Sequence, residues 1–286
     1  MGRYKKILVA IDGSEISLHA LRESFTFAKA ERSLISVLSV IPRYEGDLGA
    51  AWLDNIRESM KKPCALALSE AEKIAKEEGV SIRTVCEEGE IYERIVDFAD
   101  AENCDLIVMG RKGMSRLERT LVGSVTARVI GHAHRDILVI PEGATFGVNK
   151  ILLATDGSKF SEIATERAVD FARSYGSVLY VVSIVNVPPE FYSYVKALDT
   201  ADDLIKNARK FIDTVKEKAE AQGVKTEAFV KEGEPSKIIT DLSKEQKIDI
   251  IFVGSHGRTG LRRLLMGSNT EKVIGQSTCP VLVTST

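Results

Sequence analysis

Short apolar segments of strand length alternate with amphipathic stretches along the first half of the chain. Residues 5–11 and 34–41 are apolar and rich in β-branched side chains, which is typical of buried strands. The segment between them places its apolar residues on one helical face, formed by Leu18, Leu21, Phe25 and Ala28. This half therefore opens with a predicted strand, helix and strand.

The rest of this half continues the alternation. The pattern predicts a helix over 54–79, a strand over 80–86, a helix over 90–101, a strand over 105–110, a short helix from 124 and a last strand over 137–140. Gly79 fits the end of the long helix, whose apolar stripe is Cys64, Ala67, Ala71 and Ile74. Because several strands are apolar throughout, the pattern predicts a parallel sheet covered on both faces and hence an α/β doubly wound fold.

The whole pattern occurs twice. Segment 7–14 recurs 144 residues later as segment 151–158. Three further anchors shift by the same amount, namely 88–90 to 232–234, 106–110 to 250–254, and 123–124 to 267–268. A repeat of about 140 residues is as long as a whole domain. The sequence therefore predicts two tandem domains, 1–142 and 149–286, joined by a linker over 143–148.

Composition excludes several classes of protein. The chain has 286 residues, 44% of them hydrophobic and 28% charged, with a net charge of −2, which is typical of a globular protein rather than a disordered one. The chain lacks the basic excess that is typical of nucleic-acid-binding proteins, so we expect no nucleic-acid partner. No apolar run approaches the roughly 18 residues of a membrane helix. The apolar run at the N-terminus is too short for a signal-peptide core, so we expect a cytoplasmic protein.

The four cysteines form no C-x-x-C pair, which gives no support for a zinc or thioredoxin-like site. We expect Cys64, Cys86, Cys104 and Cys279 to be reduced and to behave as small core side chains, as in a reducing compartment. His132 and His134 form a conceivable metal pair, but no further ligand accompanies them. We expect both to be solvated, and we expect Trp52 to have an ordinary packing role.

Candidate chemistry lies where two predicted strands end. Asp12-Gly13-Ser14 follows the first strand, and Gly110-x-x-Gly113 follows the fourth. Ligands of doubly wound sheets bind at the carboxyl ends of strands, where the strand order reverses. If the order reverses between these two strands, both segments line one crevice. The alternative is that each is a plain turn.

A longer glycine pattern is present in both halves. Nine residues separate Gly113 from Gly123-Ser124, and the second half repeats the spacing with Gly254, Gly257, Gly267 and Ser268. Glycines let backbone amides approach an anion, and Gly-Ser at a helix start offers free N–H groups to phosphate. The intervening loops are basic, with Arg111, Lys112, Arg116 and Arg119 in the first half and Arg258, Arg262 and Arg263 in the second. The alternative is a helix cap beside a solvated loop.

Asp12 and Asp156 stand beside this crevice at equivalent positions. A carboxylate there suits ribose hydroxyls or serves as an outer partner for Mg²⁺. The alternative is a turn or helix-capping role.

With these motifs the chain resembles the ATP-binding universal stress proteins over its whole length. The resemblance implies the strand order 3-2-1-4-5, contacts from Asp12 and Asp156 to ribose or adenine, backbone contacts to adenine at Val40 and Ile184, and phosphate contacts at Thr126 and Thr270. The complete set expected to bind nucleotide is Ala10, Ile11, Asp12, Val40, Met109, Gly110, Arg111, Gly113, Gly123, Ser124, Val125 and Thr126 in the first half, and Ala154, Thr155, Asp156, Ile184, Val253, Gly254, Gly257, Gly267, Ser268, Asn269 and Thr270 in the second.

The first half departs from the family pattern at two points. It has Arg135-Asp-Ile-Leu-Val139 where the second half has Cys279-Pro-Val-Leu-Val283, and Arg111-Lys112 where the second half has Ser255-His256. The resemblance also implies dimerisation through the fifth strand of each domain. Segments 137–140 and 281–284 could pair within one chain as a pseudo-dimer, or two chains could form a homodimer.

These observations predict a regulatory or stress-response protein that binds an adenine nucleotide, ATP or AMP, in each domain, with Mg²⁺ where ATP is bound. No P-loop, G-x-G-x-x-G, H-E-x-x-H or G-x-S-x-G motif is present, so we name no catalytic residue and no metal ligand. Two alternatives stay open. One is a slow ATP hydrolase, for which Asp12 and Asp156 are the only candidate bases, and the other is a scaffold that does not use nucleotide.

Overall fold

The chain forms two compact units, Met1–Ala144 (unit 1) and Thr145–Thr286 (unit 2). The structure is a computed structural model that describes residues 3–43, 50–114, 121–186, 200–257 and 266–285. For residues 50–58 and 200–202 it describes the backbone only. In the sequence, the division between the two units falls within the predicted linker, 143–148.

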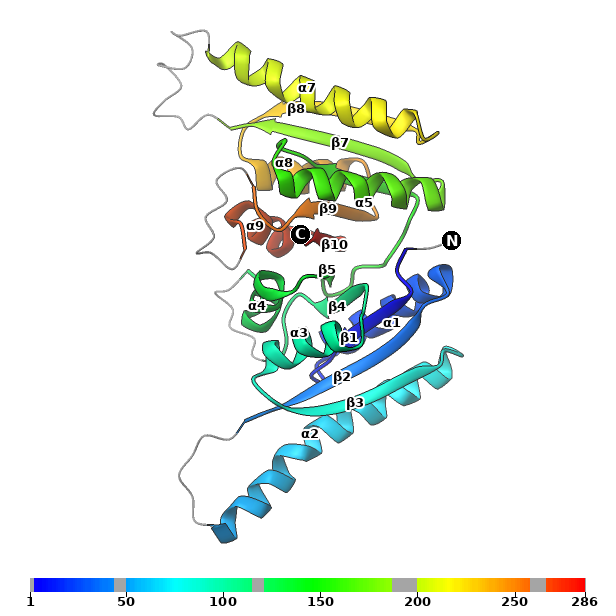
Figure 1. Cartoon of the computed structure of the whole chain (residues 1–286), viewed down its shortest axis with the longest axis vertical. Coiled ribbons are helices and arrows are strands. Elements are labelled where there is room, and N and C mark those ends of the chain that lie inside the picture. Colours follow the sequence, from blue (N-terminus) through cyan, green and yellow to red (C-terminus); the bar gives the residue numbers. More distant parts are fainter. Residues whose placement is uncertain (1–2, 44–49, 115–120, 187–199, 258–265, 286) are drawn as a thin grey trace. The chain divides into compact units, whose positions relative to one another are not determined.

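Within its described residues, unit 1 is a five-stranded sheet flanked by four helices (Figure 1). Its elements are β1 (Lys6–Ala10), α1 (Glu15–Glu31), β2 (Leu34–Pro42), α2 (Ala50–Glu77), β3 (Ile82–Gly89), α3 (Ile91–Ala101), β4 (Leu106–Gly110), α4 (Ser124–His132) and β5 (Asp136–Ile140). All paired strands are parallel, and their order is β3-β2-β1-β4-β5. The expected order 3-2-1-4-5 is confirmed, and it reverses between β1 and β4.

Unit 2 repeats this architecture (Figure 1). Its elements are β6 (Lys150–Ala154), α5 (Lys159–Tyr175), β7 (Val178–Val185), α7 (Thr200–Glu220), β8 (Thr226–Glu232), α8 (Pro235–Glu245), β9 (Ile250–Gly254), α9 (Ser268–Gln276) and β10 (Val281–Thr284). Its parallel order is β8-β7-β6-β9-β10. The predicted α/β doubly wound fold is therefore present in both units.

The apolar runs of the sequence become the buried centre of each sheet. Residues 7–9 of β1 and 106–108 of β4 are fully buried, as expected for strands that have helices on both faces. In unit 1, α1 and α2 pack on one face and α3 and α4 on the other. Ser14 begins α1 by accepting a hydrogen bond from the amide of Ser17 (3.2 Å), and Ser158 begins α5 in the same way.

Several predicted boundaries move by a few residues. Strand β3 continues to Gly89 rather than ending near residue 86, because it pairs with β2 as far as Pro42. Helix α2 begins at Ala50 rather than 54 and contains Pro63 in its interior. Long-range pairing decides the end of β3, and such pairing leaves no mark in the local pattern of polar residues.

The expectation of four reduced cysteines is wrong for two of them. Cys64 of α2 and Cys86 of β3 form a disulfide, with their Cα atoms 6.4 Å apart. Thr84 of β3 donates a hydrogen bond to Glu72 of α2 (2.8 Å), so the face of β3 that carries residues 84 and 86 is turned towards the helix. The apolar stripe of α2 thereby brings Cys64 over Cys86, which the 22-residue separation alone does not reveal.

Cys104 and Cys279 are buried free thiols, as expected. Burial raises the pKa of the Cys104 thiol to about 11 and also raises that of Cys279. Both sulfurs therefore stay protonated near neutral pH. Among the described residues, no helix is long and apolar enough to cross a membrane.

Candidate functional site

The carboxyl ends of β1 and β4 bring the two predicted motifs together in unit 1. The two strands are neighbours, with Ile7 opposite Leu106 and Val9 opposite Val108. Beyond the strands, the amide of Met114 donates a hydrogen bond of 2.7 Å to Oδ2 of Asp12. The Asp-Gly-Ser turn and the glycine turn thus lie side by side.

Asp12 is held by several donors. Its Oδ1 accepts hydrogen bonds from the amide (3.0 Å) and the hydroxyl (2.6 Å) of Ser14. Burial alone would raise the pKa of this carboxyl, but the hydrogen bonds from Ser14, Met114 and Ser17 outweigh it and hold the pKa below the ordinary value of 3.8. Asp12 is therefore ionised at neutral pH, which makes it a hydrogen-bond acceptor and a weak base.

Asp156 occupies the equivalent place in unit 2. Its Oδ1 accepts a hydrogen bond from the amide of Ser158 (3.0 Å). A Cβ on Gly257 would lie 2.9 Å from Oδ2 of Asp156, so the glycine turn again passes directly over the carboxylate. In both units the absence of a side chain on the second motif glycine allows this close approach.

The first motif glycine also has a packing reason to be glycine. A Cβ on Gly110 would lie 2.8 Å from Cγ2 of Ile16 in α1, and one on Gly254 would lie 2.9 Å from Cβ of Phe160 in α5. Helices α1 and α5 therefore pack against the glycine that ends β4 or β9. This constraint acts alongside the expected access of backbone amides to an anion.

Helices α4 and α9 begin at the third motif glycine. Gly123 and Gly267 are their N-cap residues, and neither supplies a side-chain cap. The first amides of each helix therefore receive no capping hydroxyl or carboxylate from that residue, and free helix amides of this kind are favourable for an anion. Ser124 and Ser268 are exposed at these helix starts.

Thr126 and Thr270 have a more specific role than the sequence indicated. Their hydroxyls donate hydrogen bonds to the carbonyl oxygens of Gly110 (3.1 Å) and Gly254 (2.9 Å). Each threonine thereby fixes its helix to the end of its strand. In this arrangement the hydroxyl proton goes to that carbonyl, and the phosphate contacts expected of the two threonines stay a prediction.

In unit 2 these elements enclose a cavity of about 390 Å³, which is within the size range of small-molecule sites. All eleven residues predicted for this half line it, namely Ala154, Thr155, Asp156, Ile184, Val253, Gly254, Gly257, Gly267, Ser268, Asn269 and Thr270. A second set of lining residues was not predicted, and it includes Ser183, Asn186, Leu204, Ala208, Pro235, Ile239 and His256.

The missed residues come from several elements, among them β7, α7 and α8. Leu204 and Ala208 occupy apolar positions of an amphipathic helix. In the sequence they look like ordinary core residues, because their contact with the cavity depends on the packing of α7 against β7. His256 lies between the first two motif glycines, and its ring packs 5.2 Å from that of Phe160. Its place within the motif was the one signal available for it.

The predicted residues of unit 1 lie at the equivalent positions. Ala10 ends β1 and Ile11 and Asp12 follow it, Val40 is in β2, Met109 and Gly110 end β4, Arg111 and Gly113 form the turn, and Gly123, Ser124, Val125 and Thr126 begin α4. Burial lowers the pKa of the Arg111 guanidinium, and Glu142 opposes that shift. The other basic residues predicted here, Arg116, Arg119, Arg258, Arg262 and Arg263, lie outside the described residues, as does the side chain of Trp52.

In each unit an ion pair links the N-cap residue of α3 or α8 to the following helix, α4 or α9. Glu90 pairs with Arg128 at 3.1 Å, and Glu234 pairs with Lys272 at 2.8 Å. The hydrogen bond from Lys272 lowers the pKa of Glu234. Over the described ranges, no group of three His, Cys, Asp or Glu side chains could hold a metal ion.

Comparison with known proteins agrees with this architecture. The sequence model of the universal stress protein family matches the chain twice, over residues 3–141 and 147–285. The chain belongs to the universal stress protein family. It is a tandem member, since the two matches together cover nearly all of its length.

Relatives of this universal stress protein include single-domain and tandem chains. Universal stress protein MJ0531 of Methanocaldococcus jannaschii is 41% identical over 140 residues, which cover 48% of this chain and 82% of that protein. A universal stress protein of Mycolicibacterium smegmatis is 24% identical over 290 residues, covering 97% of this chain and 96% of that protein. The crystal structure of a universal stress protein from Archaeoglobus fulgidus DSM 4304 is 23% identical with a TM-score of 0.73, covering 98% of this chain and 96% of that one. That likeness supports the fold.

Proposed function

We propose that this universal stress protein is a regulatory, stress-response protein that binds one adenine nucleotide, ATP or AMP, in each unit. The observation that carries the proposal is the cavity of unit 2, which the glycine motif, Asp156 and the end of β7 line together. One cavity thereby holds an apolar wall, a carboxylate and uncapped helix amides. These three features match the base, the sugar and the phosphates of a nucleotide.

The two ends of the cavity differ in chemistry. Val182, Ile184, Leu204 and Ala208 line one part with apolar side chains, which suits a flat heteroaromatic base. Gly267 and Ser268 line another part at the start of α9, where helix amides favour phosphate. In the proposal, Ile184 and Val40 offer backbone groups to adenine in their respective units.

The carboxylates lie beside these parts. Asp156 lines the cavity and is anchored by the amide of Ser158. In the proposal, Asp12 and Asp156 accept hydrogen bonds from ribose hydroxyls. Where ATP is bound, its phosphates carry Mg²⁺ and a carboxylate acts on the ion through water.

We propose binding without hydrolysis, and the character of the Asp12 carboxylate in unit 1 supports it. A general base works best when its pKa is near the operating pH, whereas the hydrogen bonds around Asp12 hold its pKa below the ordinary value. An anchored, fully ionised carboxylate suits ligand orientation better than proton abstraction. We therefore propose that occupancy, rather than turnover, carries the signal.

Three further features of the proposal concern the setting of the protein. We expect it to act in the cytoplasm and to have no nucleic-acid partner. Strands β5 and β10, each at one end of the sheet order of its unit, are the expected dimer contacts. Pairing within one chain or between two chains remains a prediction.

Nucleotide binding is testable by thermal unfolding of the full chain with ATP and Mg²⁺, or with AMP. At 100 times the dissociation constant, each occupied site stabilises its unit by about 2.7 kcal/mol. For a unit of this size we expect the melting temperature to rise by roughly 5–10 °C. Isothermal titration then gives the expected stoichiometry of about two nucleotides per chain.

The matched variants are Ser124→Asp with Ser268→Asp, compared with Ser124→Asn and Ser268→Asn. Aspartate in the first helical turn is favourable for the helix by roughly 0.3–1 kcal/mol, so the fold is retained while the phosphate is repelled. We expect the Asp variants to lose binding in the altered unit and the Asn variants to keep it. Binding that survives both Asp substitutions, or no thermal shift of the unaltered protein at millimolar nucleotide, contradicts the proposal.

A further inference from the structure

The Cys64–Cys86 disulfide joins a helix to the edge strand of unit 1. Cys64 is 3% exposed, whereas Cys86 is exposed on β3, the last strand in the sheet order of this unit. Cys86 lies beside Ser39 of β2 in the parallel register. The sulfur of Cys64 is 3.6 Å from the carbonyl oxygen of Ser39, so the disulfide bridges α2 to both β2 and β3.

The same place in unit 2 is part of the cavity wall. The 144-residue offset makes Ala208 the counterpart of Cys64 and Ser183 the counterpart of Ser39. Both Ala208 and Ser183 line the cavity. The disulfide of unit 1 is therefore located at the wall of the equivalent site, on the side assigned to the nucleotide base.

Helix α2 also reaches the turn that carries Asp12. A Cβ on Gly13 would lie 3.3 Å from Cβ of Ala67, one helical turn beyond Cys64. The position of α2 therefore bears on two parts of the site, the apolar wall and the carboxylate turn. Any change in how firmly α2 is held against the sheet changes both.

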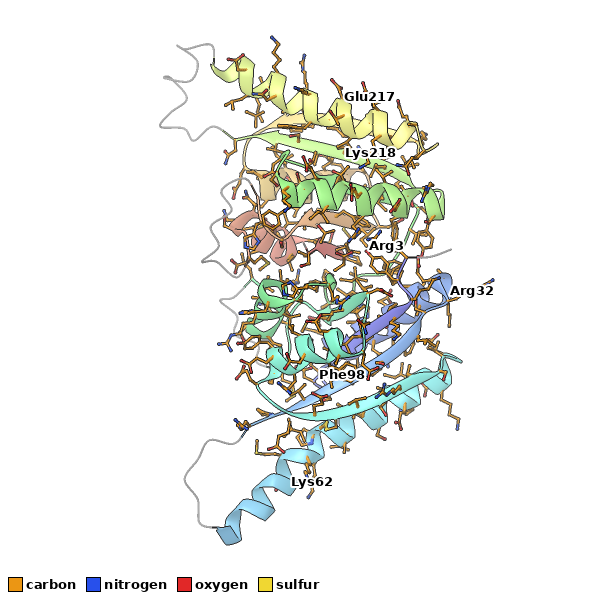
Figure 2. All side chains as sticks on the ribbon, viewed as in Figure 1. Arg3, Arg32, Lys62, Phe98, Glu217 and Lys218 are labelled. Carbon is orange, nitrogen blue, oxygen red and sulfur yellow. A yellow bond between two sulfur atoms is a disulfide. The ribbon has the colours of Figure 1, made fainter. Side chains whose placement is uncertain are left out.

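Cys64 is the point at which α2 joins the core. Of the described side chains of α2, residues 59–63 are not buried, and Cys64 is the first buried one. Pro63 precedes it and cannot donate the helical hydrogen bond at this position. In Figure 1 the N-terminal half of α2 diverges from β3, and Lys62, labelled in Figure 2, lies in that stretch next to Pro63 and Cys64. The disulfide is thus the link to the sheet that lies nearest to the N-terminal half of α2.

We propose that the Cys64–Cys86 pair is a redox switch that tightens nucleotide binding in unit 1 when oxidised and weakens it when reduced. The inference rests on the proposed function, whose regulation it specifies. Unit 2 has no such pair, because Ala208 and Val230 stand at the two positions. The switch therefore acts on one of two otherwise similar sites. Disulfides in reducing compartments are rare and mostly catalytic or redox-sensing.

The chemistry is thiol–disulfide exchange with a dithiol reductant. A thiolate of the reductant attacks the sulfur of the exposed Cys86, and Cys64 leaves as a thiolate, which takes up a proton from water. The resulting thiol can donate a hydrogen bond to the carbonyl of Ser39. The second reductant thiol then closes a disulfide within the reductant and releases Cys86, which is protonated. Two electrons and two protons reach the protein, and a disulfide oxidant reverses the reaction.

The test uses the full chain with ATP and Mg²⁺, in oxidised form and after reduction by dithiothreitol. The variant S268D leaves only the site of unit 1, and S124D leaves only the site of unit 2. We expect reduction to weaken ATP binding by S268D about tenfold, within the usual range of coupling between sites. Binding by S124D is expected to be the same in both forms, which controls for effects of the reductant.

A second variant, C64A with C86V, introduces the residue pair of unit 2 into unit 1. Combined with S268D, it is expected to bind ATP as weakly as the reduced form and to ignore dithiothreitol. The switch is overturned if S268D binds ATP equally well in the two forms, or if peptide mass analysis finds Cys64 and Cys86 still as free thiols after treatment with an oxidant. Neither result contradicts nucleotide binding itself. Absence of ATP binding by the unsubstituted protein in both forms overturns the proposed function instead.

Discussion

Replacing Asp12 by asparagine removes one hydrogen bond and one charge at a single atom. The carbonyl oxygen of Asn can still accept from Ser14, but its NH₂ group cannot accept from the amide of Met114, which now lies 2.7 Å from Oδ2. A hydrogen bond to a charged group contributes about 1.5–3 kcal/mol. Since Met114 is exposed and water can replace part of the bond, we expect Asp12→Asn to lower the free energy of unfolding of unit 1 by about 1.5–2 kcal/mol.

The effect of Asp12→Asn depends on pH in a direction that the structure dictates. The pKa of Asp12 is lowered on folding, so its stabilisation is fully present above the unfolded-state value of about 3.9. It is lost as the pH falls through the lower folded-state pKa. The two proteins should therefore differ fully at pH 7 and progressively less below about pH 4.

Urea unfolding followed by tryptophan fluorescence is a suitable assay, because the single tryptophan, Trp52, belongs to unit 1. Glu77→Gln, at an exposed position in α2, is the matched control and should change stability by less than about 0.5 kcal/mol. An unchanged urea midpoint for Asp12→Asn at pH 7, or an equal loss at pH 7 and pH 3, would refute the hydrogen-bond account of Asp12.

Two other predictions concern Thr270 in unit 2 and Cys104 in unit 1. Thr270→Val leaves the carbonyl of Gly254 without its 2.9 Å hydrogen bond in a buried place, so unit 2 should lose about 1–2 kcal/mol by urea unfolding, whereas Thr270→Ser should keep most of its stability; equal losses for both variants would contradict this role. Because burial raises the pKa of Cys104 to about 11, native protein at pH 8 should resist iodoacetamide at Cys104 for hours in peptide mass analysis, and rapid alkylation there would show that the thiol is accessible.

The sequence predicted the fold well because its signals are local. Buried parallel strands such as 106–108 are apolar at every position, and the 144-residue repeat doubles each observation. The disulfide was missed for a physical reason. Cys64 occupies an apolar position of α2, and the sequence pattern there is the same whether the cysteine is a free thiol or part of a disulfide. Its partner Cys86 comes close only because α2 packs on β3.

The site was predictable to the extent that the glycine motif and the ends of the strands define it. The residues contributed by α7 and α8, such as Leu204 and Ile239, were not predictable, since their contact with the cavity depends on which strand end each helix covers. The hydrogen bond of Thr270 was not predictable either. A hydroxyl beside a phosphate motif suggests a ligand contact, whereas the carbonyl of Gly254 that accepts its hydrogen bond lies 16 residues away along the chain.

The packing of α5 on Gly254 and of α1 on Gly110 has a consequence for how such chains are interpreted. These glycines are required by the scaffold itself, so a duplicated domain that had lost its ligand would still retain them. The glycines that precede Ser124 and Ser268 are less tightly constrained, since a Cβ there would lie 3.3 Å from the backbone at 111–112 and 255–256, compared with 2.8 and 2.9 Å at Gly110 and Gly254. In a degenerating copy the start of the short helix should therefore decay first, and its integrity is the better marker of a domain that still holds its small molecule.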